Sequence, residues 1–449
     1  MSAMSTPSRL WSNSRYVTWL VSDTAKALGG GLATFALPLI ALQVTGEPAQ
    51  AGIIGAVGMV VILFASLYGG VLADRHDRVR LMVMGAGIGG ALIAGMTVLI
   101  VTGSLNFAVL LGVEIVLSTF YGLFDIAGES VLKDIVPADA LGRAQAANQA
   151  RDAILRLGAT PLGGVLLATG AWLIGVAMLV SSAVEAIAAV ALGRMRRTDR
   201  ISSRSAVPDR RTERRDDEGS TTAVTARSGA LAEIREGVSW LMRRRDLRPI
   251  LFTMTAVNLG FSTATTTIIY LLQQRGESPA VIGLLGSAIG AATLIGALLA
   301  TPLVSRVRAG TITIVALVLP VATVGILPFT DSVPVMIAAP AIALLFTPPL
   351  NAALLGYSMV AIPTELVGRV RSAMTVIVSG AMPLAPLIAG AGLSTVGPAV
   401  TLGIAALLCA ATFVLALCTP ALRSLPAEAG WAAHAAKFTD AGRVPASVR

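Results

Sequence analysis

Twelve long apolar runs constrain what this chain can fold into. A helix that crosses a bilayer needs about 20 mainly apolar residues. Runs of this length, separated by glycine, proline and clusters of charge, recur along the 449 residues. We predict membrane-spanning helices at approximately 16–43, 50–73, 80–102, 106–132, 141–168, 171–193, 250–272, 280–304, 311–328, 334–361, 370–395 and 398–419. With 13% charged residues and a mean hydropathy of +0.78, the composition excludes a soluble enzyme and a nucleic-acid-binding domain. The fold class is therefore an all-α membrane protein.

The positive charges predict the orientation of these helices. Of the 34 Lys and Arg residues, 30 fall in segments that an inside N-terminus would place in the cytoplasm, and only Arg275 falls outside. Lys26, Arg151 and Arg156 lie within predicted spans. Cytoplasmic loops of membrane proteins carry such an excess of positive charge. We therefore predict a multi-pass protein of the cell membrane with both termini in the cytoplasm, and the net charge of +9 does not indicate a nucleic-acid partner.

One long polar segment divides the spans into six and six. Residues 198–228 mix both charges with small residues and cannot bury enough apolar surface to become ordered. Apolar residues at helical spacing follow, at Leu231, Ile234, Val238 and Leu241, which predicts an amphipathic helix on the inner membrane surface. The predicted domains are a six-helix bundle at 1–195, a linker with this helix at 196–248, a second six-helix bundle at 249–420 and a mobile cytoplasmic tail at 421–449.

The two halves repeat a short motif at equivalent positions. The segment 136–143 reads VPADALGR and the segment 362–369 reads IPTELVGR, each between an even-numbered span and the next odd-numbered one. The shared or similar residues of the two loops are Pro137, Gly142, Arg143, Pro363, Glu365, Gly368 and Arg369. A weaker echo pairs Pro48, Gly52 and Gly55 with Pro279, Gly283 and Gly286. Duplicated halves around a site at the membrane midplane are typical of secondary transporters.

The loop between the second and third spans carries a family signature. Residues 70–80 read GVLADRHDRVR, which closely resembles the G-x-L-A-D-R-x-G-R-R-x signature of the major facilitator superfamily. Asp77 stands in place of its second glycine and Val79 in place of one basic residue. The resemblance covers nearly all of 10–420. It implies two pseudo-symmetric six-helix bundles that rock about a central cavity lined by spans one, four, seven and ten.

Further segments resemble one branch of that superfamily, the macrolide-efflux and enterobactin-exporter type of drug:proton antiporter. They are Ala36–Pro38 with Thr45 and Gly46 at the end of span one, both loops of the repeat, and 233–237 before span seven. The stretch 158–164 is a degenerate form of the antiporter motif of that family. The resemblance implies export of a small molecule in exchange for protons.

The signature loop is a candidate conformational latch. Asp74 would meet the N-terminus of span eleven near Gly368, where the helix dipole favours an anion. Arg75 and Arg78 could pair with carboxylates such as Glu129 or Asp134. The alternative is that these arginines only follow the charge bias of cytoplasmic loops. The candidate latch residues are Gly70, Asp74, Arg75, Arg78 and Arg80.

Charged residues within the predicted spans all lie in the first half. Such residues are costly in a membrane and are functional candidates by default. Apolar surroundings favour the neutral form of a carboxyl group, which can then bind and release a proton near neutral pH. We expect Glu114 to couple protons, followed by Asp125 and Asp23. The remaining candidates for cavity or intramembrane polar residues are Lys26, Ser118, Tyr121, Asp152, Arg156, Asn258, Tyr270, Asn351 and Tyr357.

Structural ion pairs are the alternative for several of these charges. Asp23 and Lys26 are spaced i,i+3, and Asp152 and Arg156 are spaced i,i+4, so each pair could interact along its own helix. Span six adds Glu185. Neither His76 nor His434 has a second ligand at metal-binding spacing, and no phosphate-binding loop is present in the sequence. We therefore expect no enzyme, cofactor or metal.

The functional prediction is proton-coupled efflux of a small amphipathic compound, such as a drug, antibiotic or siderophore-like molecule, by a monomer in the lipid bilayer. Its partners are the small-molecule substrate and protons. Two alternatives remain open. One is a facilitator or symporter that imports a nutrient, and the other is a membrane sensor or scaffold that does not transport.

Overall fold

The computed structural model describes residues 13–136, 140–205, 230–363 and 366–438. All regular elements in these ranges are helices. The helices of the first half are α1 (Ser14–Thr45), α2 (Pro48–Arg75), α3 (Arg78–Val101), α4 (Phe107–Ile135), α5 (Leu141–Thr169) and α6 (Ala171–Ser205). They form the first bundle.

The second half repeats this pattern with more breaks. The helices are α7 (Ala230–Arg243), α8 (Leu247–Gln274), α9 (Pro279–Arg306), α10 (Ala309–Ile326) with the short η3 (Leu327–Phe329), α11 (Val333–Leu344), α12 (Thr347–Ala361), α13 (Val367–Ala381), α14 (Leu384–Thr395), α15 (Pro398–Cys418), α16 (Pro420–Arg423), η5 (Glu428–Gly430) and α17 (Trp431–Ala436). Pro348 and Pro383 lie at the breaks between α11 and α12 and between α13 and α14. Proline cannot donate the backbone hydrogen bond of a continuing helix, which favours a break at these two positions.

Ten segments of the described chain are long and apolar enough to cross a membrane. Helices α5 and α8 are not among them, although they have 29 and 28 residues. Their polar side chains lower the mean hydropathy, and their length is sufficient for a span. The ten segments together with α5 and α8 are consistent with the predicted twelve.

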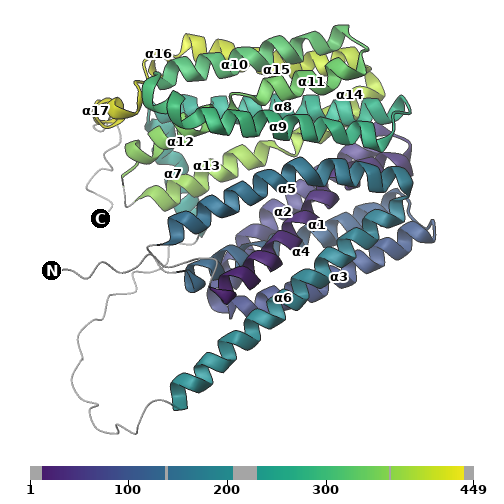
Figure 1. The fold of residues 1–449 in the computed structure, drawn as a ribbon. Helices are drawn as coiled ribbons and strands as arrows, with labels where there is room; N and C mark the ends of the chain where they lie inside the picture. Colours follow the sequence, from purple (N-terminus) through teal and green to yellow (C-terminus); the bar gives the residue numbers. More distant parts are fainter. Residues whose placement is uncertain (1–12, 137–139, 206–229, 364–365, 439–449) are drawn as a thin grey trace, which may run out of the picture.

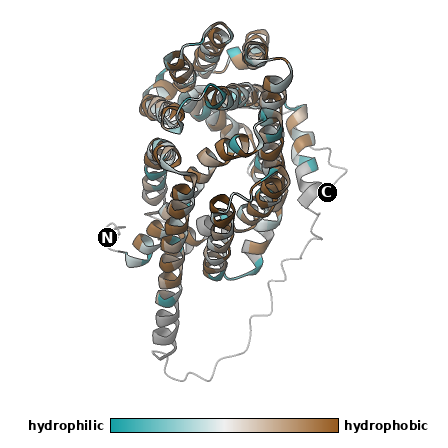
Figure 2. Ribbon diagram, turned by 90° about the vertical axis from the view of Figure 1, so that its right-hand side faces the viewer, coloured by the Kyte–Doolittle hydropathy of each residue, from teal (hydrophilic) through white to brown (hydrophobic). Residues whose placement is uncertain are grey.

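The helices form two bundles whose long axes run side by side (Figure 1). Most helices pack mainly on others of their own half, whereas α5 packs mainly on α9 and α14 packs mainly on α2, across the two halves. Apolar residues predominate along most of these helices (Figure 2). Side-chain caps begin several spans: Asn13 accepts hydrogen bonds from backbone amides of α1, and Asp77 does so for α3. We call the end that holds Asn13 and α17 the termini face, and the other end the opposite face.

Two segments are more ordered than the sequence predicts. Helix α6 continues to Ser205, beyond the start of the predicted linker at Thr198, because its arginines favour helix even outside an apolar environment. Residues 206–229 of the linker lie outside the described residues. The tail, predicted to be mobile, packs on the second bundle as α16, η5 and α17, where Leu422, Leu425 and Trp431 are buried. This burial, which the Ala- and Pro-rich composition does not indicate, explains the difference.

A buried ionic cluster fixes the tail to the second bundle. Arg244 and Asp246 form an ion pair of 2.7 Å, with side chains that are 2% and 0% exposed. The hydroxyl group of Tyr357 donates to Asp246 Oδ2 at 2.8 Å and lies 3.0 Å from Nδ1 of His434 in α17. Because an ionised carboxylate only accepts, the hydroxyl proton goes to Asp246, and Nδ1–H of His434 donates to the tyrosine oxygen.

The environment shifts the pKa of Asp246 and the pKa of His434. Burial alone would raise the pKa of Asp246, but hydrogen bonds from Arg244 and Tyr357 outweigh it and hold that pKa below its usual value. Burial lowers the pKa of His434, and the nearby Lys437 ammonium lowers it further, while Asp246 opposes both. The neutral imidazole is therefore the form that suits the docked tail.

Glycines join the two bundles at the opposite face. Helix α2 packs on α14 so closely that a Cβ atom on Gly52 would lie 2.3 Å from the carbonyl oxygen of Pro386. A Cβ atom on Gly390 would lie 2.2 Å from the carbonyl oxygen of Pro48. Only glycine allows backbones to approach this closely.

Helices α5 and α9 make the equivalent contact on the other side of the molecule. A Cβ atom on Gly164 would lie 2.5 Å from the carbonyl oxygen of Pro279, and one on Gly283 would lie 2.9 Å from that of Thr160. The two similar segments of the sequence, at the starts of α2 and α9, thus make equivalent contacts with the other bundle. Because the starts of α2 and α9 and the ends of α5 and α14 lie at the opposite face, these contacts hold the two bundles together there.

Candidate functional site

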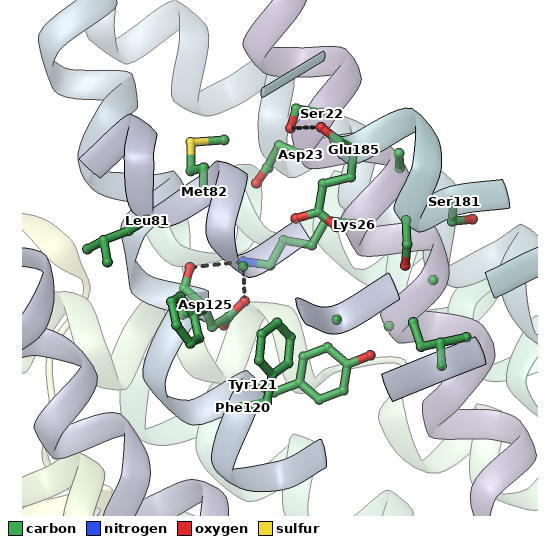
Figure 3. A pocket seen from close by; sticks show the side chains of 18 residues that line it. Ser22, Asp23, Lys26, Leu81, Met82, Phe120, Tyr121, Asp125, Ser181 and Glu185 are labelled. Carbon is green, nitrogen blue, oxygen red and sulfur yellow. Dashed lines mark hydrogen bonds and ion pairs between the residues drawn. The ribbon is translucent and has the colours of Figure 1, made fainter. Parts of the chain in front are cut away.

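A cavity lies inside the first bundle, toward the termini face. Its empty volume is about 640 Å³, including the part open to solvent, and residues of α1, α3, α4 and α6 line it (Figure 3). The resemblance had predicted a central cavity lined by spans one, four, seven and ten. The observed cavity shares only α1 and α4 with that set, so it is a different site.

Small residues on α3 create room for the aromatic side chains of this cavity. A Cβ atom on Gly89 would lie 2.9 Å from the ring of Phe120, and one on Gly85 would lie 3.3 Å from Phe124. The rings of Phe120 and Phe124 are stacked at 5.1 Å, and Tyr121 meets Phe120 edge-on at 5.5 Å. The wall formed by α4 is therefore aromatic.

Lys26 spans the cavity from α1 to α4. Its Nζ atom lies 2.6 Å from Asp125 Oδ1 and donates to the carbonyl oxygen of Asp125 at 3.0 Å (Figure 3). The Lys26 side chain is 23% exposed and that of Asp125 is 67% exposed, which places the pair at the cavity mouth. The sequence had offered Asp23 as the ion-pair partner of Lys26. That pairing is wrong, because α4 brings a carboxylate closer than the same helix does.

Arg151 on α5 holds two carboxylates at once. Its Nη2 atom lies 2.7 Å from Asp23 Oδ2 and 2.7 Å from Asp152 Oδ1. The side chains of Arg151 and Asp23 are only 15% and 17% exposed. The predicted partner of Asp152 was Arg156, whose side chain lies outside the described residues. Asp152 does have an ion-pair partner, but it is its own neighbour in sequence.

Glu114 on α4 is a half-buried residue that lies against α2, away from these ion pairs. Ser118 Oγ donates to its Oε1 atom at 2.9 Å, and its Oε2 atom is buried without a hydrogen-bond partner among the described residues. A Cβ atom on Gly58 of α2 would lie 2.1 Å from Oε1. Glycine at that position is what lets the carboxyl group lie directly on the α2 backbone.

The polar candidates of the second bundle do not form one site. Tyr270 is buried in an apolar cluster with residues of α1, α2 and α4 at the opposite face. Tyr357 belongs to the cluster that holds the tail, as described above. Asn258 is exposed and Asn351 is half-buried. The structure brings none of these four side chains into the cavity of the first bundle.

The latch residues are described only in part. Arg75 and Arg80 are exposed, and Gly70 is half-buried with open space at its Cβ position. The side chains of Asp74, Arg78 and Glu129 lie outside the described residues. The contact between Asp74 and the start of span eleven therefore stays a prediction.

The repeat loops show one contact that the sequence did not predict. Arg369 at the start of α13 donates to Glu236 of α7 at 2.8 Å, and Gly237 lets α7 lie on the carbonyl oxygen of Arg369. Pro363 and Gly368 are exposed. Pro137 and Glu365, the Arg143 side chain and the surroundings of Gly142 lie outside the described residues.

The roles of two charged residues at this site, Arg151 and Glu185, were not predicted from the sequence. The sequence indicated Arg151 only as a charge within a span and assigned no role to Glu185. Glu185 on α6 lines the cavity opposite Asp125, with Lys26 between them (Figure 3). The signal was present, since both are charges in predicted spans, but their partners come from other helices and helix neighbours cannot be read from one sequence.

Comparison with known proteins identifies the fold and the family. The model of the major facilitator superfamily matches residues 24–379, which is most of the chain. The chain belongs to the major facilitator superfamily. It is therefore a multi-pass membrane transporter of small molecules and not an enzyme. This confirms the resemblance drawn from the signature loop.

Individual relatives agree with this placement. The multidrug efflux pump Tap of Mycobacterium tuberculosis (strain ATCC 25618 / H37Rv) is 27% identical over 428 residues, covering 90% of this chain and 93% of Tap. Tap of Mycobacterium bovis (strain BCG / Pasteur 1173P2) gives the same values. Among solved structures, a bacterial homologue of the iron transporter ferroportin in an inward-facing state has a TM-score of 0.65 at 15% identity, covering 89% of this chain and 97% of that one. A bacterial homologue of the lysosomal transporter Spinster has a TM-score of 0.57 at 16% identity, covering 96% of this chain and 99% of that one.

Proposed function

We propose that this transporter exports a small amphipathic compound from the cell in exchange for protons. Similarity to the multidrug efflux pump Tap over 90% of the chain supports the direction and the type of cargo. The observation that carries the coupling to protons is the position of Glu114, whose Oε2 atom is buried inside a membrane-spanning bundle without a hydrogen-bond partner among the described residues.

Glu114 suits the binding and release of a proton for three reasons. Its Oε2 atom is buried without a partner, its Oε1 atom has only a neutral donor in Ser118, and no cation lies within ion-pair distance among the described residues. A charged carboxylate in such a place costs free energy that a bound proton removes. Gly58 of α2 lies against this carboxyl group, so the proton-binding site in this proposal lies between α2 and α4.

Asp125 and Asp23 are the next candidates for this role. Asp125 lies at the cavity mouth with Lys26, and Asp23 is held by Arg151. Both carboxylates therefore already have a cation as partner, whereas Glu114 has none within ion-pair distance among the described residues.

The glycine contacts at the opposite face support alternating access. The proposed orientation places the termini face in the cytoplasm, as the positive charges predict. The structure would then be closed toward the outside, and Asp125 would be exposed on the cytoplasmic side. Cargo would enter from the cytoplasm in this state, and the latch loop around Asp74 would hold the reverse state.

The experiment that tests proton coupling replaces Glu114 by glutamine. Glu114→Gln keeps the shape and removes the proton-binding group, so proton-driven export from proteoliposomes should be abolished while the protein still folds and still binds cargo. Glu428→Gln, at an exposed carboxylate of the tail, serves as the matched control and should export normally. Unchanged pH-dependent export by Glu114→Gln would remove Glu114 from the mechanism.

The direction of exchange separates the exporter from an importing symporter. Counterflow of labelled cargo under imposed pH gradients should accelerate when protons flow opposite to the cargo. Acceleration when both flow in the same direction would instead identify a symporter.

A further inference from the structure

We propose that the C-terminal tail, residues 420–438, is a brace that holds α12 in a fixed position relative to α10. The tail consists of α16, η5 and α17, and it lies at the termini face beside α12 (Figure 1). Helix α12 is the half of span ten nearest that face. This inference goes beyond the proposed function, because it concerns how half of a span is held in place and does not depend on the cargo.

The tail provides a helix cap at the start of α10. At the start of α3 in the first bundle, Asp77 Oδ1 accepts hydrogen bonds from two backbone amides of the first turn. The corresponding position before α10 is Arg308, whose side chain makes no such bond. The first two backbone amides of α10 instead donate to the carbonyl oxygens of Pro426 and Leu425, each at 3.2 Å. Because the first amides of a helix have no partner within the helix, the tail satisfies donors that the preceding loop leaves open.

Close packing anchors the tail at the same place. A Cβ atom on Gly310 would lie 2.3 Å from the carbonyl oxygen of Arg423, so glycine is needed for the tail to lie on α10. Leu422 and Leu425 are buried in one apolar cluster with residues of α8, α9, α10 and α12. The tail is therefore part of the core of the second bundle at the termini face.

A second set of contacts joins the tail to α12. Trp431 of α17 is buried, and a Cβ atom on Gly356 of α12 would lie 2.7 Å from its ring. The Nε1 atom of Trp431 donates at 3.1 Å to the carbonyl oxygen of Pro426, which also caps α10. Nδ1–H of His434 donates to the hydroxyl oxygen of Tyr357, the next residue of α12, at 3.0 Å. Pro426 thus connects the start of α10 to the part of the tail that lies on α12.

Span ten needs such a support because it is not one continuous helix. Helix α11 ends at Leu344 and α12 begins at Thr347. Gly296 of α9 packs on this break, where its Cβ atom would lie 2.0 Å from the carbonyl oxygen of Leu345. A few residues at the end of an element can act as a hinge. The direction of α12 is therefore set by the helices that pack on it, which include α9, α10 and α17.

The docked tail links α12 to α10 by a route that does not cross the break. With the tail in place, α12 moves as one body with the rest of the second bundle. When the tail leaves its site, α12 loses the contacts of α17 and turns about the break. The tail thereby determines whether both halves of span ten follow the movement of the second bundle.

The test measures distances between spin labels in the full chain in nanodiscs by double electron–electron resonance. One pair of labels, at Leu355→Cys on α12 and Val315→Cys on α10, reports the position of α12. A reference pair, at Val315→Cys and Leu407→Cys on α15, reports the rest of the bundle. All three positions are exposed, and the background has Cys409 and Cys418 replaced.

Variants of the tail site should affect only the first pair of labels. Trp431→Ala removes the ring that lies on α12, so the distance distribution between α12 and α10 should become at least about twice as wide. Trp431→Phe keeps a ring and should leave the distribution narrow. Gly310→Leu, which pushes the tail away from α10, should act like Trp431→Ala, whereas Gly325→Leu, with open space at its Cβ position near the other end of α10, should not.

The result with Trp431→Ala decides the inference even if Gly310→Leu fails to fold, because Trp431→Ala leaves α10 unchanged. Distributions of equal width in Trp431→Ala and the protein with the unchanged tail would overturn the inference. Equal broadening of the reference pair would overturn it too, since the tail would then stabilise the whole bundle and not the position of α12. Broadening of the first pair alone, with a narrow distribution in Trp431→Phe, is the result that the brace predicts.

Discussion

The two bundles have the same helical plan and the same closure at the opposite face, yet they differ in where their charges lie. In the first bundle, carboxylates and cations lie inside the spans, at Asp23, Lys26, Glu114, Arg151 and Glu185. In the second bundle, the ionic cluster of Arg244 and Asp246 lies at the termini face, and the interiors of its spans are uncharged. The two halves thus share the close glycine contacts and differ in where their charges lie. In the proposed mechanism, the first bundle carries the proton-binding group.

The glycine contacts at the opposite face predict the largest loss of export, and the same loss is expected for a substitution in either half. Gly52→Leu and Gly283→Leu would each push a side chain into the backbone of the other bundle, at 2.3 Å from Pro386 and 2.9 Å from Thr160. Export should fall to the level of empty vesicles for both variants, because the opposite face cannot close. Gly403→Leu on α15, with open space at its Cβ position, is the control. Normal export by only one of the two variants would show that the halves are not equivalent.

The buried cluster of the second bundle predicts a loss of stability. Asp246→Asn keeps the shape and leaves the Arg244 guanidinium buried without its counter-charge, which costs roughly 3–5 kcal/mol. Thermal unfolding in detergent measures the loss. Arg245→Gln, at an exposed neighbour, should change stability by less than about 0.5 kcal/mol. Equal unfolding temperatures for Asp246→Asn and wild type would mean that the cluster does not stabilise this bundle.

The contact of Glu114 with α2 predicts a smaller effect, in the first bundle alone. Gly58→Ala would place a methyl group 2.1 Å from Oε1 of Glu114, so the carboxyl group must move. We expect proton-driven export to fall about tenfold, with little change in stability because the end of a side chain can shift. Export rates in proteoliposomes over a range of pH measure this, and Gly87→Ala is the control. An unchanged pH profile would indicate that the position of Glu114 does not matter.

The smallest predicted effect concerns the tail and pH. The pKa of His434 is lowered in the docked tail, so the undocked tail binds a proton more readily. Docking should therefore be fully stable above the ordinary histidine pKa of about 6.5 and should weaken as pH falls below it. A spin label on Ala433→Cys, in a background with Cys409 and Cys418 replaced, should become more mobile between pH 7.5 and 5.5. The same change in His434→Gln would assign the effect to another group.

The architecture could be predicted from the sequence because the length of an apolar run and the charges beside it are properties of one short segment of the chain. The apolar runs place the spans, and the signature at 70–80 identifies the family. The ion pairs could not be predicted in the same way. Spacing along one helix suggested Asp23 with Lys26, whereas the structure pairs Lys26 with Asp125 of α4 and Asp23 with Arg151 of α5. The order of the tail was also missed, because its partners Asp246 and Tyr357 lie far away in the sequence.

The uptake and release of protons during cargo binding tests the central claim most directly. Purified protein in a weakly buffered solution receives a compound that the vesicle assay shows to be exported, and a pH indicator reports the protons released. Wild type and Glu428→Gln, which changes an exposed carboxylate of the tail, should release protons to the same extent, and Glu114→Gln should release markedly fewer. Equal release by Glu114→Gln and wild type, or a loss of release in Glu428→Gln, would contradict the assignment of the ion chemistry to the first bundle.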